Sequence, residues 1–143
     1  TIFSLLLLYL LSKQNMVTAT THKIKVSVET FYQSDYSYPM SQHFMFAYRI
    51  TIENNGSNTI QLLRRHWYIV DALGQQREVE GEGVVGEQPI IKRGEKYEYV
   101  SGCDLKTDIG KMYGTFLMEN QQDGKLFHVI IPEFYMTAPV KLN

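Results

Sequence analysis

Apolar and polar residues alternate along most of this chain. The alternation is most regular in 24–28, 44–52 and 127–131, where every second side chain is apolar or aromatic. This period of two predicts strands that bury one face and expose the other. Weaker forms of the pattern predict further strands at 59–71, 88–92, 97–101 and 112–120. No window shows the spacing of an amphipathic helix.

Short polar segments rich in Gly, Asn or Pro separate the expected strands. The strongest turn signal is Asn55-Gly56, because both residues tolerate a positive φ. We therefore expect about seven or more short strands joined by short connections. This organisation predicts an all-β protein, an antiparallel β-sandwich or barrel.

The strand expected at 59–71 changes phase along its length. Its apolar residues fall on even positions before Leu63 and on odd positions after it, as at Trp67. A β-bulge near Arg64-Arg65 reconciles the two halves. We expect Trp67, the only tryptophan, to lie in the core, as in immunoglobulin-type domains.

The first residues do not follow the strand pattern. Residues 2–11 form a nearly unbroken apolar run, shorter than the roughly 20 residues that span a bilayer. No basic residue precedes this run and no small-residue cleavage site follows it. We expect 1–15 to be an N-terminal extension outside the fold and 16–143 to be a single domain. A truncated export signal or membrane anchor is the alternative.

Composition narrows the function classes. The chain is 44% hydrophobic, which is enough for a core without disulfide staples. A net charge of −1 gives no overall signal for nucleic-acid binding. The single cysteine, Cys103, cannot form an internal disulfide, so a cytoplasmic location is expected.

A glycine motif follows the Trp67 strand. Gly81, Gly83 and Gly86 match the G-x-G-x-x-G fingerprint, whose glycines normally open a helix that holds a pyrophosphate. The sequence after Gly86 continues as an extended segment, so a Rossmann site is not expected. Two interpretations stay open: a tight loop with glycines at positive φ, or an anion-binding nest to which Arg64, Arg65 and Lys92 supply positive charge. Acidic residues crowd the same loop and oppose phosphate binding.

The remaining candidate chemistry is sparse. The four histidines and Cys103 show no zinc-like spacing, so no metal or cofactor is expected. Ser101-Gly102-Cys103-Asp104 has no nucleophile elbow and no evident base. We therefore expect no catalytic site; a hydrolase acting on nucleoside polyphosphates is the remote alternative.

Several motifs taken together resemble the ApaG family over residues 17–142. They are Leu63-x-Arg65-x-Trp67-x-Ile69-x-Asp71, then Gly81-Glu82-Gly83-Val84-Val85-Gly86-Glu87-Gln88-Pro89, then Tyr97-x-Tyr99-x-Ser101-Gly102, then Leu105-x-Thr107-x-x-Gly110-x-Met112-x-Gly114 and Val129-x-Ile131-Pro132-x-Phe134. The chain departs from the family pattern at two turn positions, Arg93 and Asp108, where the family usually or often has proline.

The resemblance implies a fibronectin type III-like β-sandwich in a small cytosolic protein without established catalysis. It implies a link, through the family name, to cobalt resistance and magnesium efflux. In eukaryotes the domain that this chain resembles occurs in F-box proteins and in a polymerase-delta-interacting protein, where it looks like a protein-binding module. The family's glycine motif has also been discussed as a nucleotide or pyrophosphate site, which carries over to Gly81, Gly83 and Gly86, with Arg65 as the matching arginine.

Two functions are therefore expected. The first is a non-enzymatic interaction module with a protein partner and an indirect role in cobalt and magnesium homeostasis; an edge strand also allows homo-oligomers. The alternative is a protein that binds nucleotides or pyrophosphate. No nucleic acid partner and no membrane span are expected. The candidate ligand- or partner-binding residues are Arg65, Gly81, Glu82, Gly83, Val84 and Gly86.

Overall fold

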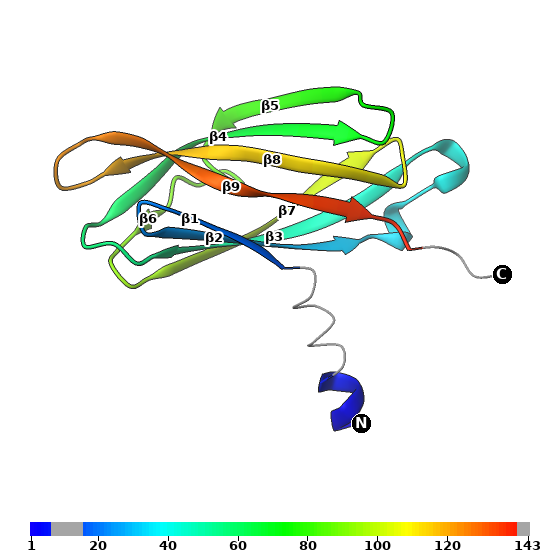
Figure 1. Ribbon diagram of the computed structural model, residues 1–143, viewed down its shortest axis with the longest axis horizontal. Coiled ribbons are helices and arrows are strands. Elements are labelled where there is room, and N and C mark those ends of the chain that lie inside the picture. Colours follow the sequence, from blue (N-terminus) through cyan, green and yellow to red (C-terminus); the bar gives the residue numbers. More distant parts are fainter. Residues whose placement is uncertain (7–15, 140–143) are drawn as a thin grey trace.

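The computed structural model describes residues 1–6 and 16–139, and most of these lie in two antiparallel β-sheets packed face to face (Figure 1). The strands are β1 (Val17–Thr21), β2 (Ile24–Tyr32), β3 (Phe44–Asn54), β4 (Ile60–Asp71), β5 (Gln76–Glu82), β6 (Ile90–Ile91), β7 (Lys96–Leu105), β8 (Ile109–Asn120) and β9 (Leu126–Thr137). The prediction of an all-β antiparallel sandwich is confirmed. The fibronectin type III likeness stays a prediction.

The sheets have four and five strands. The first has the order β1-β2-β3-β7, and the second has the order β5-β4-β8-β9, with the short β6 pairing the same edge of β4 as β5. Two 3-10 turns, Ser34–Tyr36 and Pro39–Ser41, lie between β2 and β3, and residues 2–6 are helical. No helix in the described part of the chain is long and apolar enough to cross a membrane.

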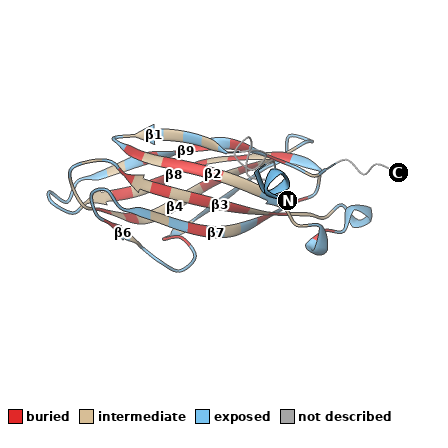
Figure 2. Cartoon of the chain, turned by 90° about the horizontal axis from the view of Figure 1, so that it is seen from below, coloured by how far each residue is buried: buried red, intermediate tan, exposed pale blue. Residues whose placement is uncertain are grey.

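Buried residues alternate with less buried ones along the strands of both sheets (Figure 2). Trp67 is buried as expected, and its ring meets those of Tyr48 and Phe134 at centroid distances of 5.5 and 5.9 Å. Aromatic contacts between strands of opposite sheets thus fix how the sheets face each other.

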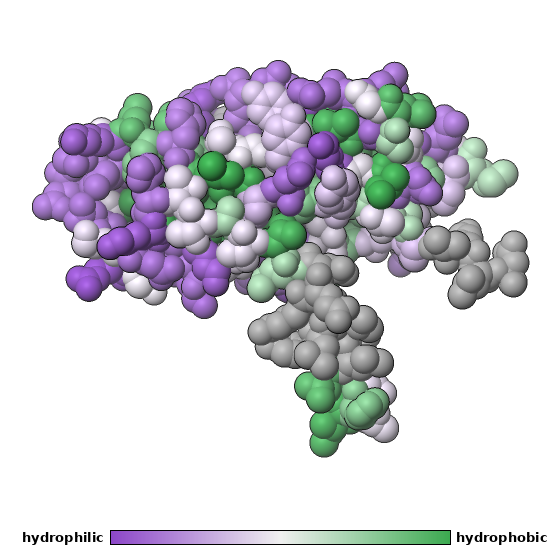
Figure 3. All heavy atoms as spheres, viewed as in Figure 1, coloured by the Kyte–Doolittle hydropathy of each residue, from purple (hydrophilic) through white to green (hydrophobic). Residues whose placement is uncertain are grey.

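Outside the core, hydrophilic residues gather at the end of the molecule that carries the β8–β9 turn (Figure 3).

The bulge predicted in β4 is present, one residue before the expected position. The register of β4 against β8 shifts between Leu62 and Arg64. After the shift, Arg65 and Trp67 face the interior, while Arg64 and His66 face solvent. The bulge therefore turns a charged side chain, Arg65, toward the space between the sheets.

Two strands were missed by the alternation pattern. β1 precedes the first expected strand, and β5 lies between the strand expected at 59–71 and the expected strand at 88–92, and includes Gly81 of the glycine motif. β5 gave no signal because nearly all of its side chains are exposed, on both faces. Conversely, the strand expected at 88–92 contains only Ile90–Ile91. Most of the 1–15 extension lies outside the described residues.

Candidate functional site

The glycine segment is fastened to the bulge of β4. Leu63 O accepts hydrogen bonds from Gly83 N at 2.8 Å and from Gln88 Nε2 at 3.0 Å. Leu62 N donates to Pro89 O at 3.0 Å. Residues 83–89 therefore form a loop that joins β5 to β6, and both of these strands pair with the same edge of β4. The bulge in β4 holds both ends of this loop.

Each position of the motif requires glycine for its own structural reason. At Gly81, within β5, an added Cβ would lie 3.0–3.2 Å from the guanidinium atoms of Arg65. At Gly83, with φ of 63°, it would lie 2.3 Å from Glu87 O. Gly86 has open space around it but a φ of 78°. Gly81 thus allows close approach, whereas Gly83 and Gly86 supply left-handed backbone.

The tip of the loop is a type I′ turn. Val84 N donates to Glu87 O at 2.8 Å and Glu87 N donates to Val84 O at 3.0 Å. The two central residues, Val85 and Gly86, have φ of 47° and 78°. Asn or Gly normally fills the first central position, and a β-branched residue there is strained. The turn therefore holds Val85 in an unfavourable conformation.

The two valines of this turn have opposite environments. Val84 is only 1% exposed and belongs to the core, whereas Val85 is 64% exposed. Val84 therefore anchors the loop, and Val85 is its exposed apolar side chain. Sequence reasoning selected Val84 and missed Val85. The available signal was its place before Gly86 in a short turn between two extended segments.

Arg65 supports the loop from inside. Its Nη1 donates to Glu82 O at 2.8 Å and to Gly83 O at 3.0 Å. No carboxylate forms an ion pair with Arg65 among the residues that the structure describes. Burial raises the pKa of Tyr99 well above its usual value, and the nearby Arg65 charge partly opposes this rise. Arg65 is thus a loop-supporting cation between the sheets, and its Nε and Nη2 donate to no residue in the described part of the chain.

The solvent face beside Arg65 is acidic. Arg64 lies 3.9 Å from carboxylate oxygens of both Glu80 and Glu82 on β5. All three groups are substantially exposed, so these pairs contribute little to stability. The carboxylates nevertheless place negative charge close to the loop, which disfavours a polyanion there.

The far end of the loop is held by a buried asparagine. Asn54 Nδ2 donates to Ile91 O at 2.9 Å and to Asn58 O at 2.8 Å, and Asn54 Oδ1 accepts from Gly56 N at 3.0 Å. The side chain is fully buried, so its hydrogen bonds form away from water. Asn54 therefore ties β6, and with it the end of the glycine loop, to the turn after β3.

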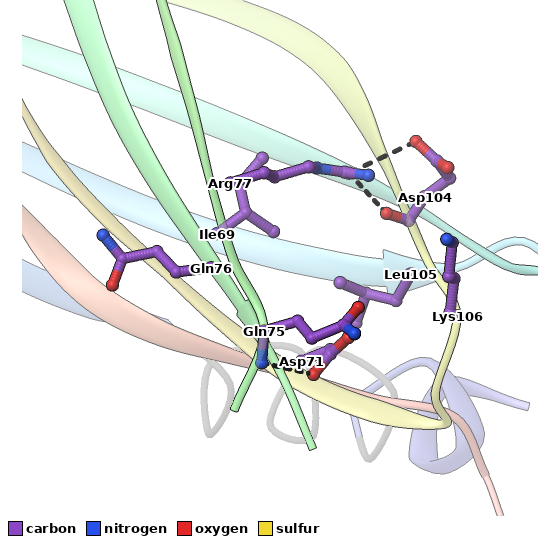
Figure 4. Close-up of a pocket in the computed structure, with 8 residues that line it drawn as sticks. All are labelled: Ile69, Asp71, Gln75, Gln76, Arg77, Asp104, Leu105 and Lys106. Carbon is purple, nitrogen blue, oxygen red and sulfur yellow. Dashed lines mark hydrogen bonds and ion pairs between the residues drawn. The ribbon is translucent and has the colours of Figure 1, made fainter. Parts of the chain in front are cut away.

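A depression of about 200 Å³ lies where the ends of β4 and β7 meet the start of β5 (Figure 4). Its lining residues are Ile69, Asp71, Gln75, Gln76, Arg77, Asp104, Leu105 and Lys106. Arg77 Nη2 donates to the backbone oxygen of Asp104 and lies 3.2 Å from Asp104 Oδ1. Arg77 thus links the edge strands of the two sheets, β5 and β7.

The geometry brings Arg65, Gly81, Glu82 and Gly83 together, with Gly86 at the loop tip and Val84 in the core beneath it. Behind Gly86 the chain forms β6, so the expectation that no helix follows the motif is confirmed. The amides of Gly83, Val84 and Glu87 already donate within the protein. Within 1–6 and 16–139, no group of three or more His, Cys, Asp or Glu side chains is placed to hold a metal ion.

Comparison with known proteins identifies the family. Residues 34–120 match the ApaG domain. Protein ApaG of Paramagnetospirillum magneticum is 51% identical over 124 residues, which cover 87% of this chain and 95% of that protein. Protein ApaG of Acidithiobacillus ferrooxidans is 49% identical over 116 residues, covering 81% and 91%. A crystal structure of an ApaA protein from Bordetella pertussis is 41% identical, with a TM-score of 0.80 and coverage of 86% and 99%. The chain therefore belongs to the ApaG domain family.

Proposed function

We propose that this chain is a non-enzymatic protein-binding module, formed by the sandwich domain of 16–143, and that loop 83–89 contacts the partner. The observation that carries this proposal is the conformation of Val85. An exposed β-branched side chain occupies a left-handed position that costs on the order of 1–3 kcal/mol. Such strain is characteristic of binding and catalytic sites, where it supports a function other than stability.

The construction of the loop supports the same proposal. Arg65, the bulge at Leu63 and the core residue Val84 fix the loop from three sides. A rigid loop loses little conformational entropy on binding, which favours affinity. Val85 then offers a partner one exposed apolar contact, and the carboxylates of Glu82 and Glu87 offer polar contacts around it.

The link to cobalt resistance and magnesium efflux comes from the family resemblance. We place this link in the bound partner, because the proposed activity of the chain is protein binding. A cytoplasmic location is part of the same proposal and rests on the single cysteine, Cys103, whose thiol is buried and free.

Affinity capture from a lysate of the source organism tests the proposal. The Val85→Asp variant replaces the apolar loop contact with a charge, and the matched control is Leu73→Asp, which alters an exposed apolar residue in the β4–β5 turn. We expect Val85→Asp to lose partners that the wild-type chain and Leu73→Asp both retain. Identical partners for all three chains would contradict a role for the loop.

A further inference from the structure

We propose that the open edge of β7 receives an extended segment of a partner protein as a fifth strand of the first sheet, and that this segment carries one inward-facing carboxylate. This inference rests on the proposed protein-binding function and names a second contact surface together with the chemistry of its partner. In the described part of the chain, β3 pairs with one edge of β7 and no strand pairs with the other. An extended peptide can complete such an edge through main-chain hydrogen bonds.

The direction of the backbone groups of β7 follows from its register with β3. Asn54 N donates to Glu95 O at 3.0 Å, and the register continues from Glu53 opposite Lys96. Hydrogen-bonding direction alternates along a strand, so the odd-numbered residues of β7 bond to β3. The even-numbered residues then direct their amides and carbonyls to the open edge. The bond from Arg77 to the Asp104 carbonyl agrees with this direction.

The edge strands β5 and β7 differ in how well they are protected against pairing with another chain. β5 carries charges at four of its seven residues, Arg77, Glu78, Glu80 and Glu82. Charged edge strands resist pairing with other chains. The middle of β7, residues 99–103, is uncharged, and Val100 there is 55% exposed. β7 is therefore the edge on this side of the sandwich that is suited to accept another strand.

The second sheet extends beyond β7, so its edge strand β5 covers the open position, where a strand added beside β7 would lie. The ring of Tyr99 on β7 meets Phe116 of β8 at a centroid distance of 6.5 Å, so β7 faces the β8–β4 side of the second sheet. β5 lies beyond β4 and has no strand of the first sheet beneath it, which explains why Val79 on its inner face is 39% exposed. A strand added beside β7 would cover Val79.

The position of β5 above this edge also determines whether a second copy of the chain or a peptide segment fits there. If a second copy paired its own β7 here, the twofold axis would bring each β5 over the partner's β7. That space is already occupied by the partner's own β4. A single extended segment without a second sheet has no such overlap, so a peptide segment fits this edge better than a second copy.

The charge between the sheets sets the chemistry of the segment. Arg65 packs on the inner side of Gly81, directly above the open position, and makes no ion pair with a described carboxylate. The donors on its Nε and Nη2 suit a carboxylate, which accepts charge-assisted hydrogen bonds from a guanidinium. An Asp or Glu side chain in the inward row of the added strand, at the level of Tyr99, would reach them.

A groove on the outer face supplies a position for the opposite row of side chains. Gly102 lacks a side chain at the edge, and an added Cβ would lie 2.8 Å from Met45 Cε. The groove beside it has a volume of about 610 Å³ and a mainly apolar surface, to which Tyr36, Met45 and Ala47 contribute; Gln33, His43 and Asp104 also line it. We therefore expect an apolar residue in the outward row of the segment, opposite Gly102.

Random linear peptides displayed on phage, selected on the immobilised full chain, provide the probe. We expect enrichment of peptides with an acidic residue and an apolar residue on opposite rows of a strand. Val100→Pro should lower their affinity by about tenfold or more, because it removes an edge amide without breaking a bond to β3. The matched control, Glu80→Pro, removes an outward amide from β5 and should leave the affinity unchanged. Replacing the peptide's acidic residue by its amide should lower affinity by a similar factor.

Three results would overturn the inference: no enriched linear peptide, equal affinity for wild type and Val100→Pro, or no loss on neutralising the acidic residue. Hydrogen exchange gives a readout specific to the register. Bound peptide should slow exchange of the amides of Val100 and Gly102 but not of residues already bonded to β3. If the peptides instead lose affinity on Val85→Asp alone, the proposed function stands and this second surface is wrong.

Discussion

The guanidinium of Arg65 lies against the backbone of Gly81, so closely that a Cβ at Gly81 would stand 3.0 Å from Nη1. From this position Arg65 reaches the carbonyls of Glu82 and Gly83. The sequence of this motif resembles a phosphate-binding site. In the structure, the guanidinium of Arg65 lies against the motif and donates hydrogen bonds to its backbone carbonyl oxygens. The glycine segment is a supported loop between two strands.

Gly81→Ala should destabilise the protein by about 1–2 kcal/mol, because the added methyl displaces Arg65 from two charge-assisted hydrogen bonds. Urea denaturation measures the change in unfolding free energy. The matched control is Gly102→Ala, where the added methyl meets the flexible end of Met45 and lies at an ordinary contact distance, 3.4 Å, from Phe46 O, so a change within about 0.5 kcal/mol is expected. Equal effects of the two substitutions would contradict the role given to Arg65.

Asn54→Ala should cost about 2–4 kcal/mol, since it removes a buried side chain and leaves the Ile91 and Asn58 carbonyls without their donor. Asn55→Ala, at an exposed neighbouring position, is the control and should change the unfolding free energy little. A melting temperature for Asn54→Ala close to that of the control would show that β6 is held by other contacts.

Stability should fall at alkaline pH. Burial raises the pKa of Tyr99, Tyr48 and Cys103, from ordinary values of 10.0 for the tyrosines and 9.0 for the thiol. The unfolded chain therefore loses these protons first, so the stabilisation is complete below about pH 9 and declines as pH rises above it. Chemical denaturation between about pH 8 and pH 11 measures this decline.

Tyr99→Phe separates this effect from general alkaline damage. The Tyr99 hydroxyl is buried and has no hydrogen-bond partner among residues 1–6 and 16–139. Removing it should raise the unfolding free energy at neutral pH by up to about 1 kcal/mol and make the alkaline decline shallower. A variant that is less stable at neutral pH and equally sensitive to alkali would contradict this assignment.

Isothermal titration with pyrophosphate, at about 1 mM ligand, should give no saturable heat. The amides of Gly83 and Val84 already donate within the protein, and Glu80 and Glu82 add negative charge nearby. Saturable binding that disappears in Arg65→Lys, with the fold retained by circular dichroism, would assign the loop to phosphate ligands instead.

Much of the fold is readable from the sequence because one face of most strands is buried. The alternation in β2, β3 and β9 follows from this burial, and the phase change near Leu63 indicated a real bulge. The alternation pattern did not indicate β5, because this strand extends beyond the first sheet and neither of its faces needs apolar residues. A period-two pattern detects burial rather than strand geometry.

The site was less readable, because its parts depend on contacts distant in sequence. The three glycines were visible, but only the structure separates Gly81, which makes room for Arg65, from the turn glycines Gly83 and Gly86. Val84 and Val85 are identical in the sequence, and only the phase of the turn decides which one is buried. The open edge of β7 depends on the strand order and has no local signal at all.

Val85→Asn separates the strain at Val85 from its binding role, because Asn suits the first central position of a type I′ turn and removes the exposed apolar contact. Unfolding free energy and partner capture should be measured on the same preparation. We expect a gain of about 1 kcal/mol in stability together with a loss of captured partner. A variant that is more stable and still captures the same partner at wild-type strength would contradict the claim that the strained Val85 serves binding.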